Sequence, residues 1–131
     1  MKGILLLALS LCASPGHAHE GHDKTPGSKS APHGGIIQGT NDLYLELLPT
    51  AEGVEIYPLD HDMNPVPLKN VKMKGTMTFP RKTKKEDVTF SDSGDKFLAK
   101  IDAKGAHRYT LDLSVTHDGK TEKLKFNVEP K

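Results

Sequence analysis

The strongest constraint on the fold of this chain is a repeated alternation of apolar and polar residues between short turns. From Gly35 onward, apolar side chains recur at every second position in seven segments. A period of two places these side chains on one face of a β-strand, whereas a helix repeats every ~3.6 residues. The segments cover residues 43–47, 54–57, 71–79, 88–90, 97–101, 109–115 and 124–128.

Turn residues separate these segments and indicate how the strands connect. Residues 60–67 and 91–95 are expected to be loops, and Asp118-Gly119 predicts a tight hairpin because this pair favours a two-residue turn. The pattern favours an all-β fold, a small antiparallel immunoglobulin-like β-sandwich of about seven strands. A closed barrel is the alternative, because strand number alone does not decide closure.

Residues 1–18 are expected to be a signal peptide. A positively charged start precedes an apolar run over residues 4–12, and small residues at Gly16 and Ala18 precede the proposed cleavage site. The run is about half as long as the ~20 residues that a membrane-spanning helix needs. We therefore expect cleavage after Ala18, a periplasmic location and no membrane span.

The single cysteine agrees with export. Cys12 lies inside the apolar run, so the chain from His19 onward has no thiol. Such a chain suits an oxidising compartment and offers no thiolate ligand or cysteine nucleophile. A lipoprotein acylated at Cys12 is a minor alternative, disfavoured because Leu11 is not the small residue that normally precedes a lipidated cysteine.

Charge and motif content exclude several functions. Removing residues 1–18 takes away Lys2 and leaves 17 basic and 17 acidic residues. A chain with no net formal charge has no general field that attracts nucleic acid. The sequence has no nucleophile elbow, phosphate-binding glycine loop or zinc-protease motif. Its carboxylates are expected on solvent faces and in turns, so we expect no enzyme and propose no catalytic residue.

Histidines mark residues 19–34, which we expect to be a flexible leader or a pinned arm because they lack apolar periodicity. Cleavage after Ala18 would give His19 a free amine beside its imidazole, with His22 in reach. Nitrogen ligands of this kind suit copper(II), nickel or zinc. A solvated tail with incidental histidines is the alternative.

A second candidate metal site is the loop over residues 60–67. His61 and Met63 are two positions apart, so both side chains can point the same way in an extended loop. An imidazole with a thioether accepts copper(I) and tolerates copper(II), whereas zinc and nickel gain little from the sulfur. The alternative is that Met63 fills the end of the core and His61 is a solvated loop residue.

Four short motifs follow one another between residues 31 and 65. They are Ala31-Pro32-His33-Gly34-Gly35, Leu45-Glu46-Leu47, Val54-Glu55-Ile56-Tyr57 and Asp60-His61-Asp62-Met63-Asn64-Pro65. Their order resembles a small periplasmic heavy-metal-binding β-domain, similar to the N-terminal domain of adaptor (membrane fusion) proteins of heavy-metal efflux pumps. The resemblance implies metal handling at the cell envelope and points to His33 and His61. The helical hairpin and lipoyl-like segments of a full adaptor are missing from this sequence.

These observations lead to one functional hypothesis and one alternative. The hypothesis is a periplasmic carrier or buffer of a transition metal, preferably copper, with an efflux pump component as a candidate partner. The alternative is an immunoglobulin-like envelope interaction module with no metal role. We expect a signal peptide over residues 1–18, a leader over 19–34 and a β-sandwich over 35–131. The proposed metal ligands are His19, His22, His33, His61 and Met63.

Overall fold

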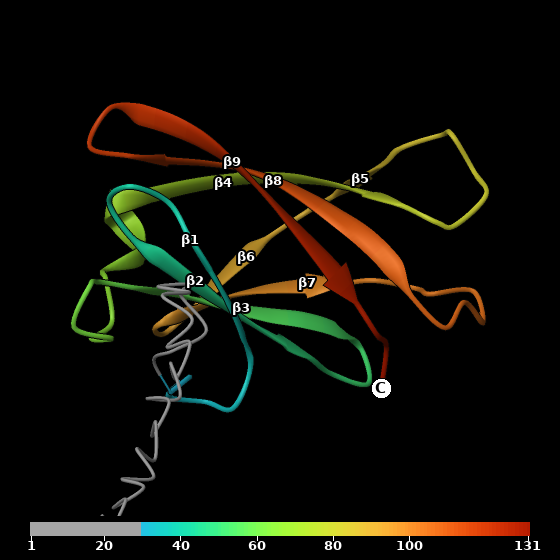
Figure 1. The fold of residues 1–131 in the computed structure, drawn as a ribbon, viewed down its shortest axis with the longest axis horizontal. Helices are drawn as coiled ribbons and strands as arrows, with labels where there is room; N and C mark the ends of the chain where they lie inside the picture. Colours follow the sequence, from blue (N-terminus) through green and yellow to red (C-terminus); the bar gives the residue numbers. More distant parts are fainter. Residues whose placement is uncertain (1–29) are drawn as a thin grey trace, which may run out of the picture.

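A computed structural model describes residues 30–131, which form two antiparallel β-sheets packed face to face (Figure 1). One sheet has the strand order β1-β2-β3-β7-β6, and the other has the order β5-β4-β8-β9. The predicted small β-sandwich is confirmed, and the closed-barrel alternative is wrong because the strands divide into two sheets. The strands are β1 (Ile36–Gly39), β2 (Tyr44–Pro49), β3 (Gly53–Leu59), β4 (Val71–Thr78), β5 (Glu86–Val88), β6 (Ser91–Ser93), β7 (Lys96–Lys100), β8 (Tyr109–His117) and β9 (Lys120–Val128).

The structure has nine strands, two more than the alternation predicts. The additional strands, β1 and β6, are short and lie at the two edges of the five-stranded sheet. β6 reads Ser-Asp-Ser, a sequence typical of a turn, and it pairs only with β7. β1 contains two adjacent isoleucines instead of an alternation, and Ile36 is 45% exposed. Both strands form through backbone pairing with a neighbour, which leaves little apolar pattern in the sequence.

The predicted connections agree with the structure at two places. The loop after β3 spans the expected residues and is followed by a short 3₁₀ helix, η2 (Leu68–Asn70). Asp118 and Gly119 have φ values of 51° and 75° and join β8 to β9 as a tight hairpin. Positive φ at both central positions is the geometry that favours Asp-Gly.

The core lies between the two sheets and consists of the alternating apolar residues. Leu45, Leu47 and Ile56 come from the five-stranded sheet, and Leu111 and Phe126 come from the four-stranded sheet. All five are at most 1% exposed. At one edge, the backbone and side-chain amides of Asn41 donate to the carboxylate of Glu122 at 3.0 and 2.7 Å. This contact ties the loop between β1 and β2 to β9 in the opposite sheet.

Residues 30–131 contain no helix that is long and apolar enough to cross a membrane.

The buried Tyr109 makes the stability of the fold sensitive to high pH. Tyr109 is 3% exposed, and burial raises the pKa of its phenol from the usual 10.0 to about 12. Between these values the unfolded chain loses this proton first, so the free energy of unfolding falls as the pH rises. We predict that the wild-type protein loses stability more steeply over this range than Tyr109→Phe, as measured by urea unfolding. Equal slopes would contradict the assignment.

Candidate metal centre

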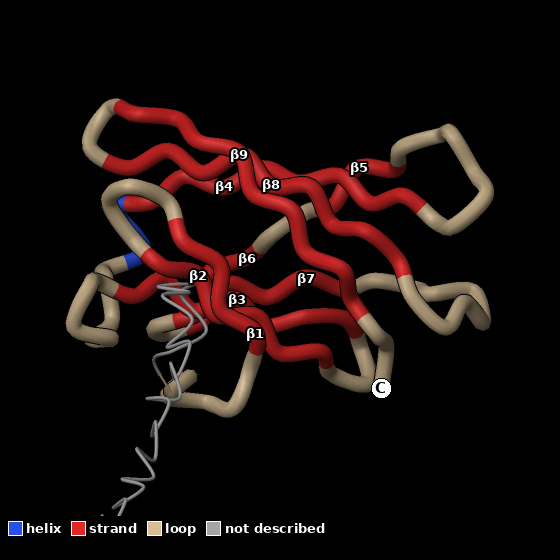
Figure 2. The backbone as a smooth tube through the Cα atoms, in the orientation of Figure 1, coloured by secondary structure: helices blue, strands red, loops and turns tan. Residues whose placement is uncertain are grey.

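An N-terminal arm, residues 30–35, leads into β1 and lies against the outer face of β2 and β3 (Figure 2). A turn shapes the arm: the amide of Gly34 donates to the carbonyl of Ala31 at 3.1 Å, and Gly34 has a φ of 76°. A positive φ is favourable for glycine, which has no Cβ to clash with the backbone. The arm covers the outer face of the five-stranded sheet, where the polar positions of the alternating pattern lie.

The arm covers Glu46, whose side chain is 0% exposed. Its Oε1 accepts hydrogen bonds from the backbone amides of His33 and Gly35 at 2.8 and 2.9 Å, and its Oε2 lies 2.7 Å from His33 Nδ1. A buried carboxylate is unfavourable unless it has partners of this kind. We call Glu46 and these three donors the carboxylate clamp. The expectation that the carboxylates lie on solvent faces and in turns is therefore wrong for Glu46.

Gly35 is required by the closeness of the arm to β2. A Cβ atom at this position would lie 2.5 Å from the carbonyl oxygen of Leu47 and 2.9 Å from Cγ of Glu46. A Cβ atom does not make contacts shorter than 3.0 Å with atoms to which it is not bonded, so any larger residue would push the arm away from the sheet. The His-Gly-Gly motif thus has a physical explanation: one glycine forms the turn and the other permits the approach to Glu46.

Two contacts fix the imidazole of His33. Its ring stacks on Tyr57, with 3.7 Å between ring centroids and 13° between ring planes. Its Nδ1 faces the carboxylate of Glu46, which can only accept a hydrogen bond. Nδ1 therefore carries the proton in the neutral imidazole, and Nε2 carries the lone pair that can bind a metal. The side chain is 32% exposed, so solutes can reach part of the ring.

A second set of contacts holds Tyr57 in place. Its hydroxyl donates to Glu55 at 3.0 Å, and Lys96 donates to the other oxygen of Glu55 at 3.1 Å. The Lys96 ammonium also lies 5.7 Å from the Tyr57 ring centroid. Burial raises the pKa of Glu55, but the hydrogen bonds from Lys96 and Tyr57 and the positive charge of Lys96 together outweigh burial, so the pKa lies below the usual 4.5. This ionised carboxylate connects β3 to β7 and supports the ring on which His33 stacks.

His61 lies in the loop after β3, and its ring meets Tyr44 edge to face with 5.4 Å between centroids. Tyr44 and Glu46 are two positions apart on β2, so they lie on the same sheet face, about 7 Å apart along the strand. His33 and His61 therefore contact side chains on the same face of the five-stranded sheet. That they bind one metal ion stays a prediction.

Met63 lies in a tightly bonded part of the same loop. Asp60 accepts hydrogen bonds from the amides of Asp62 and Asn64 at 2.8 and 2.9 Å, and its carbonyl accepts from the amide of Met63 at 3.0 Å. Met63 has a φ of 66° and is half-buried, but it lies outside the core cluster. Met63 therefore does not fill the end of the core, which was one part of the alternative interpretation. The other part, a solvated His61, agrees with the exposed position of this residue.

His19 and His22 lie outside the described residues. Within residues 30–131, no three or more His, Cys, Asp or Glu side chains are grouped so that they could hold a metal ion. Of the imidazoles among the proposed ligands, the described residues contain His33, which is oriented by Glu46 and Tyr57, and His61 in the loop after β3. Glu46 and Tyr57 were not predicted from the sequence as the residues that orient His33. The only signal for them was their place in the motif order.

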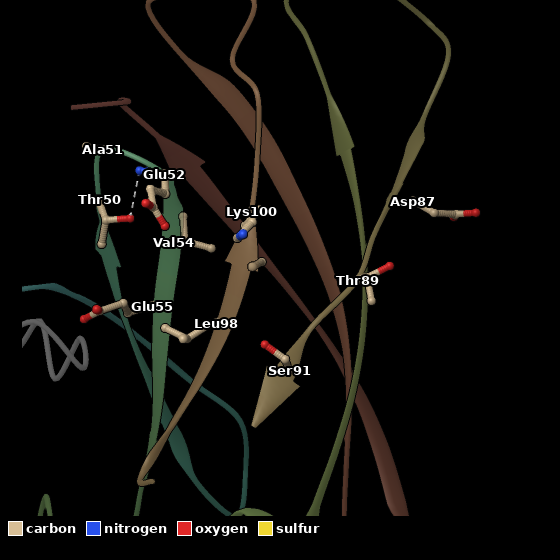
Figure 3. A pocket seen from close by; sticks show the side chains of 11 residues that line it. Thr50, Ala51, Glu52, Val54, Glu55, Asp87, Thr89, Ser91, Leu98 and Lys100 are labelled. Carbon is tan, nitrogen blue, oxygen red and sulfur yellow. Dashed lines mark hydrogen bonds between the residues drawn. The ribbon is translucent and has the colours of Figure 1, made fainter. Parts of the chain in front are cut away.

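A cavity of about 670 Å³ lies elsewhere, between β3, β7 and the segment from β5 to β6. Its carboxylates come from opposite walls: Glu52 and Glu55 lie on one side and Asp87 on the other, pointing away from them (Figure 3). The hydroxyl of Thr50 accepts from the amide of Glu52 at 3.3 Å and shapes the turn at one end. Because the charged groups do not converge, this cavity is a weaker candidate than the surface around His33.

Comparison with known proteins gives no family for this chain. No family model matches it, and neither the curated proteins nor the solved structures contain a match.

The carboxylate clamp predicts that two adjacent glycines differ in their tolerance of alanine. Gly35→Ala is expected to lower the free energy of unfolding by about 2–4 kcal/mol, through overpacking and loss of a hydrogen bond to a carboxylate. Gly34→Ala is the matched control: a Cβ there meets nothing within 4 Å. It should cost only about 1–2 kcal/mol for the left-handed backbone. Urea unfolding measures both, and equal losses would show that the arm does not need this close approach.

Proposed function

We propose that this protein binds a transition metal ion in the bacterial periplasm and acts as a carrier or buffer in metal resistance or homeostasis. Copper is the preferred ion, and zinc and nickel are the alternatives. The observation that supports this proposal best is the pairing of His33 Nδ1 with the buried carboxylate of Glu46 at 2.7 Å.

A carboxylate behind a histidine is a common arrangement at metal sites. The carboxylate fixes the tautomer and the orientation of the ring, and it raises the basicity of the nitrogen that binds the metal. In this protein the stacking of His33 on Tyr57 further limits the motion of the ring. An imidazole that is already oriented loses less conformational entropy when it binds an ion.

The remaining ligands of the proposal come from two places. His61 and Met63 lie in the loop beside the same sheet face, and together they offer an imidazole and a thioether. His19, with its amine after cleavage, and His22 belong to the part of the sequence that precedes the arm. An efflux pump component is the proposed partner, on the basis of the resemblance in motif order alone.

The competing function is an envelope interaction module in which the clamp has only a structural role. The clamp by itself accounts for the burial of Glu46 and for both glycines. A metal titration of the processed protein separates the two functions, because the interaction module would bind copper, zinc and nickel no more tightly than a chain without His33.

We predict that Glu46→Gln weakens copper(II) binding about 10- to 100-fold while the fold is retained. The glutamine carbonyl can still accept from the amides of His33 and Gly35. Its amide group must donate to Nδ1 of His33, which moves the ring proton to Nε2 and removes the lone pair that binds the metal. Calorimetry against a competing chelator measures the affinity, and circular dichroism checks the fold.

Glu122→Gln is the matched control for this experiment. It changes a carboxylate on β9 that accepts from a backbone amide and a side-chain amide of Asn41 and has no part in the contacts around His33. Copper(II) affinity should stay close to that of the wild type in this variant. If Glu46→Gln and His33→Ala both bind copper(II) as tightly as the wild type, His33 is not a ligand.

The contribution of the loop is tested with the two oxidation states of copper. Replacing His61 and Met63 together by alanine should weaken copper(I) binding more than copper(II) binding, because the thioether favours the softer ion. Deleting residues 19–30 should have the opposite effect, since it removes the imidazoles of His19 and His22 and separates the N-terminal amine from the His19 ring. Competition with a copper(I)-specific chelator and calorimetry with copper(II) measure the two affinities. Unchanged copper(I) affinity in a folded loop variant would exclude the loop from the site.

A further inference from the structure

A second pocket lies at the end of the sandwich where two loops meet, far in sequence from His33. Residues 79–82, which follow β4, and residues 103–108, between β7 and β8, line a pocket of about 450 Å³. Both loops lie at the same end of the molecule (Figure 1). We call it the basic pocket, because its lining includes Arg81, Lys82, Lys104 and Arg108, together with His107.

The charge of this pocket is not balanced locally. The whole chain has 18 basic and 17 acidic residues, yet none of the residues that line the basic pocket is acidic. Glu86 pairs with Lys104 at 3.0 Å, but both side chains are exposed by more than a third, so solvent weakens this pair. Glu129 lies with Arg108 along an adjoining hollow. Asp102, next to the pocket, accepts from the backbone amide of Lys104 at 2.8 Å. These three carboxylates are fewer than the four cations that line the pocket, so an excess of positive charge remains there.

The aromatic ring of Phe79 is part of the pocket lining, and two of the lysine ammonium groups lie near it. Phe79 is 7% exposed, and the ammonium groups of Lys82 and Lys104 lie 6.0 and 5.6 Å from its centroid. These lysines come from different loops, so the fold brings their charges to one ring. Two like charges held near one point repel each other, and an anion between them would offset that repulsion.

The backbone of both loops is fixed by turns. Lys82 donates its amide to the carbonyl of Phe79 at 3.2 Å, and Ala106 donates to the carbonyl of Ala103 at 2.9 Å. Arg81 and Lys104 have φ values of 65° and 50°, an uncommon conformation for residues with a Cβ. The cations are thus presented from backbones with a defined shape, which suits the recognition of a small anion.

We propose that the basic pocket binds a phosphate group, either as a soluble ion or as part of a lipid headgroup. Guanidinium groups match phosphate oxygens with pairs of parallel hydrogen bonds, and lysines add point charges around them. Phe79 offers an apolar surface for the group that carries the phosphate. This site is separate from the proposed metal centre, and its residues take no part in the carboxylate clamp.

The test uses two probes on the protein after removal of residues 1–18. Inorganic phosphate is titrated into isotope-labelled protein, and amide chemical shifts are followed. Separately, sedimentation is measured with vesicles of phosphatidylcholine alone and of phosphatidylcholine mixed with phosphatidylglycerol. Shifts confined to residues 79–82 and 103–108 identify a soluble phosphate as the ligand. Sedimentation with the mixed vesicles alone identifies a lipid phosphate, and either result supports the proposal.

A pair of variants separates a defined pocket from general charge. Lys82→Glu combined with Arg108→Glu should weaken binding to the responding probe by at least about tenfold, since two charge-assisted contacts are lost. Lys69→Glu combined with Lys120→Glu makes the same change in net charge at exposed positions outside the pocket, and it should have little effect. Circular dichroism checks both folds. Equal losses in the two variants, or no response to either probe, would overturn the proposal.

Discussion

The burial of one carboxylate on the outside of a sheet is the constraint on which the N-terminal half of this structure depends. Glu46 faces away from the core and is fully covered by the arm. Its charge is tolerable only because three donors surround it. Those donors come from two residues, His33 and Gly35. The contacts with Glu46 require a side chain with a hydrogen-bond donor at position 33 and a residue without a Cβ atom at position 35. One interaction thus determines the path of the arm and the orientation of an imidazole.

The contacts around Tyr57 extend this constraint across the sheet. Lys96 on β7 bonds Glu55 on β3, Glu55 accepts from Tyr57, and Tyr57 carries the His33 ring. The hydrogen bond to Glu55 raises the pKa of Lys96 above 10.5, so its ammonium remains charged at neutral pH. Because each member positions the next, the ring of His33 is supported by three strands as well as by the arm. Such support from surrounding contacts is what a preorganised binding group requires.

Sequence patterns predicted the structure best where one residue pattern has one physical cause. Alternation placed Leu45, Leu47 and Leu111 in the core, and Asp118-Gly119 defined a hairpin. The sequence did not predict strands that form by pairing with a distant segment, or side chains that a distant segment covers. β1 and β6 form by backbone pairing at an edge, and their side chains carry little trace of it.

The candidate site shows the same limit. Alternation placed Glu46 on the outer face of β2, and that is where it lies. Nothing within β2 indicates that residues 33–35 fold back over it. No local pattern predicted that His33 and His61 contact side chains on the same face of this sheet, because their placement depends on the pairing of β2 with β3 and on the path of the arm. The φ of 66° at Met63 likewise could not be predicted from the sequence, because it depends on hydrogen bonds that Asp60 makes within the loop.

Anchoring the arm at His33 has a consequence for groups that precede it in the chain. His22 is joined to His33 by eleven peptide units, a length that spans at most about 40 Å. Under the proposed function, a ligand at His22 would meet an ion bound at His33 at an effective concentration in the millimolar range, because the connection to the folded domain is so short. The clamp would thereby make this encounter intramolecular, and ligands that bind weakly one by one would together retain the ion tightly.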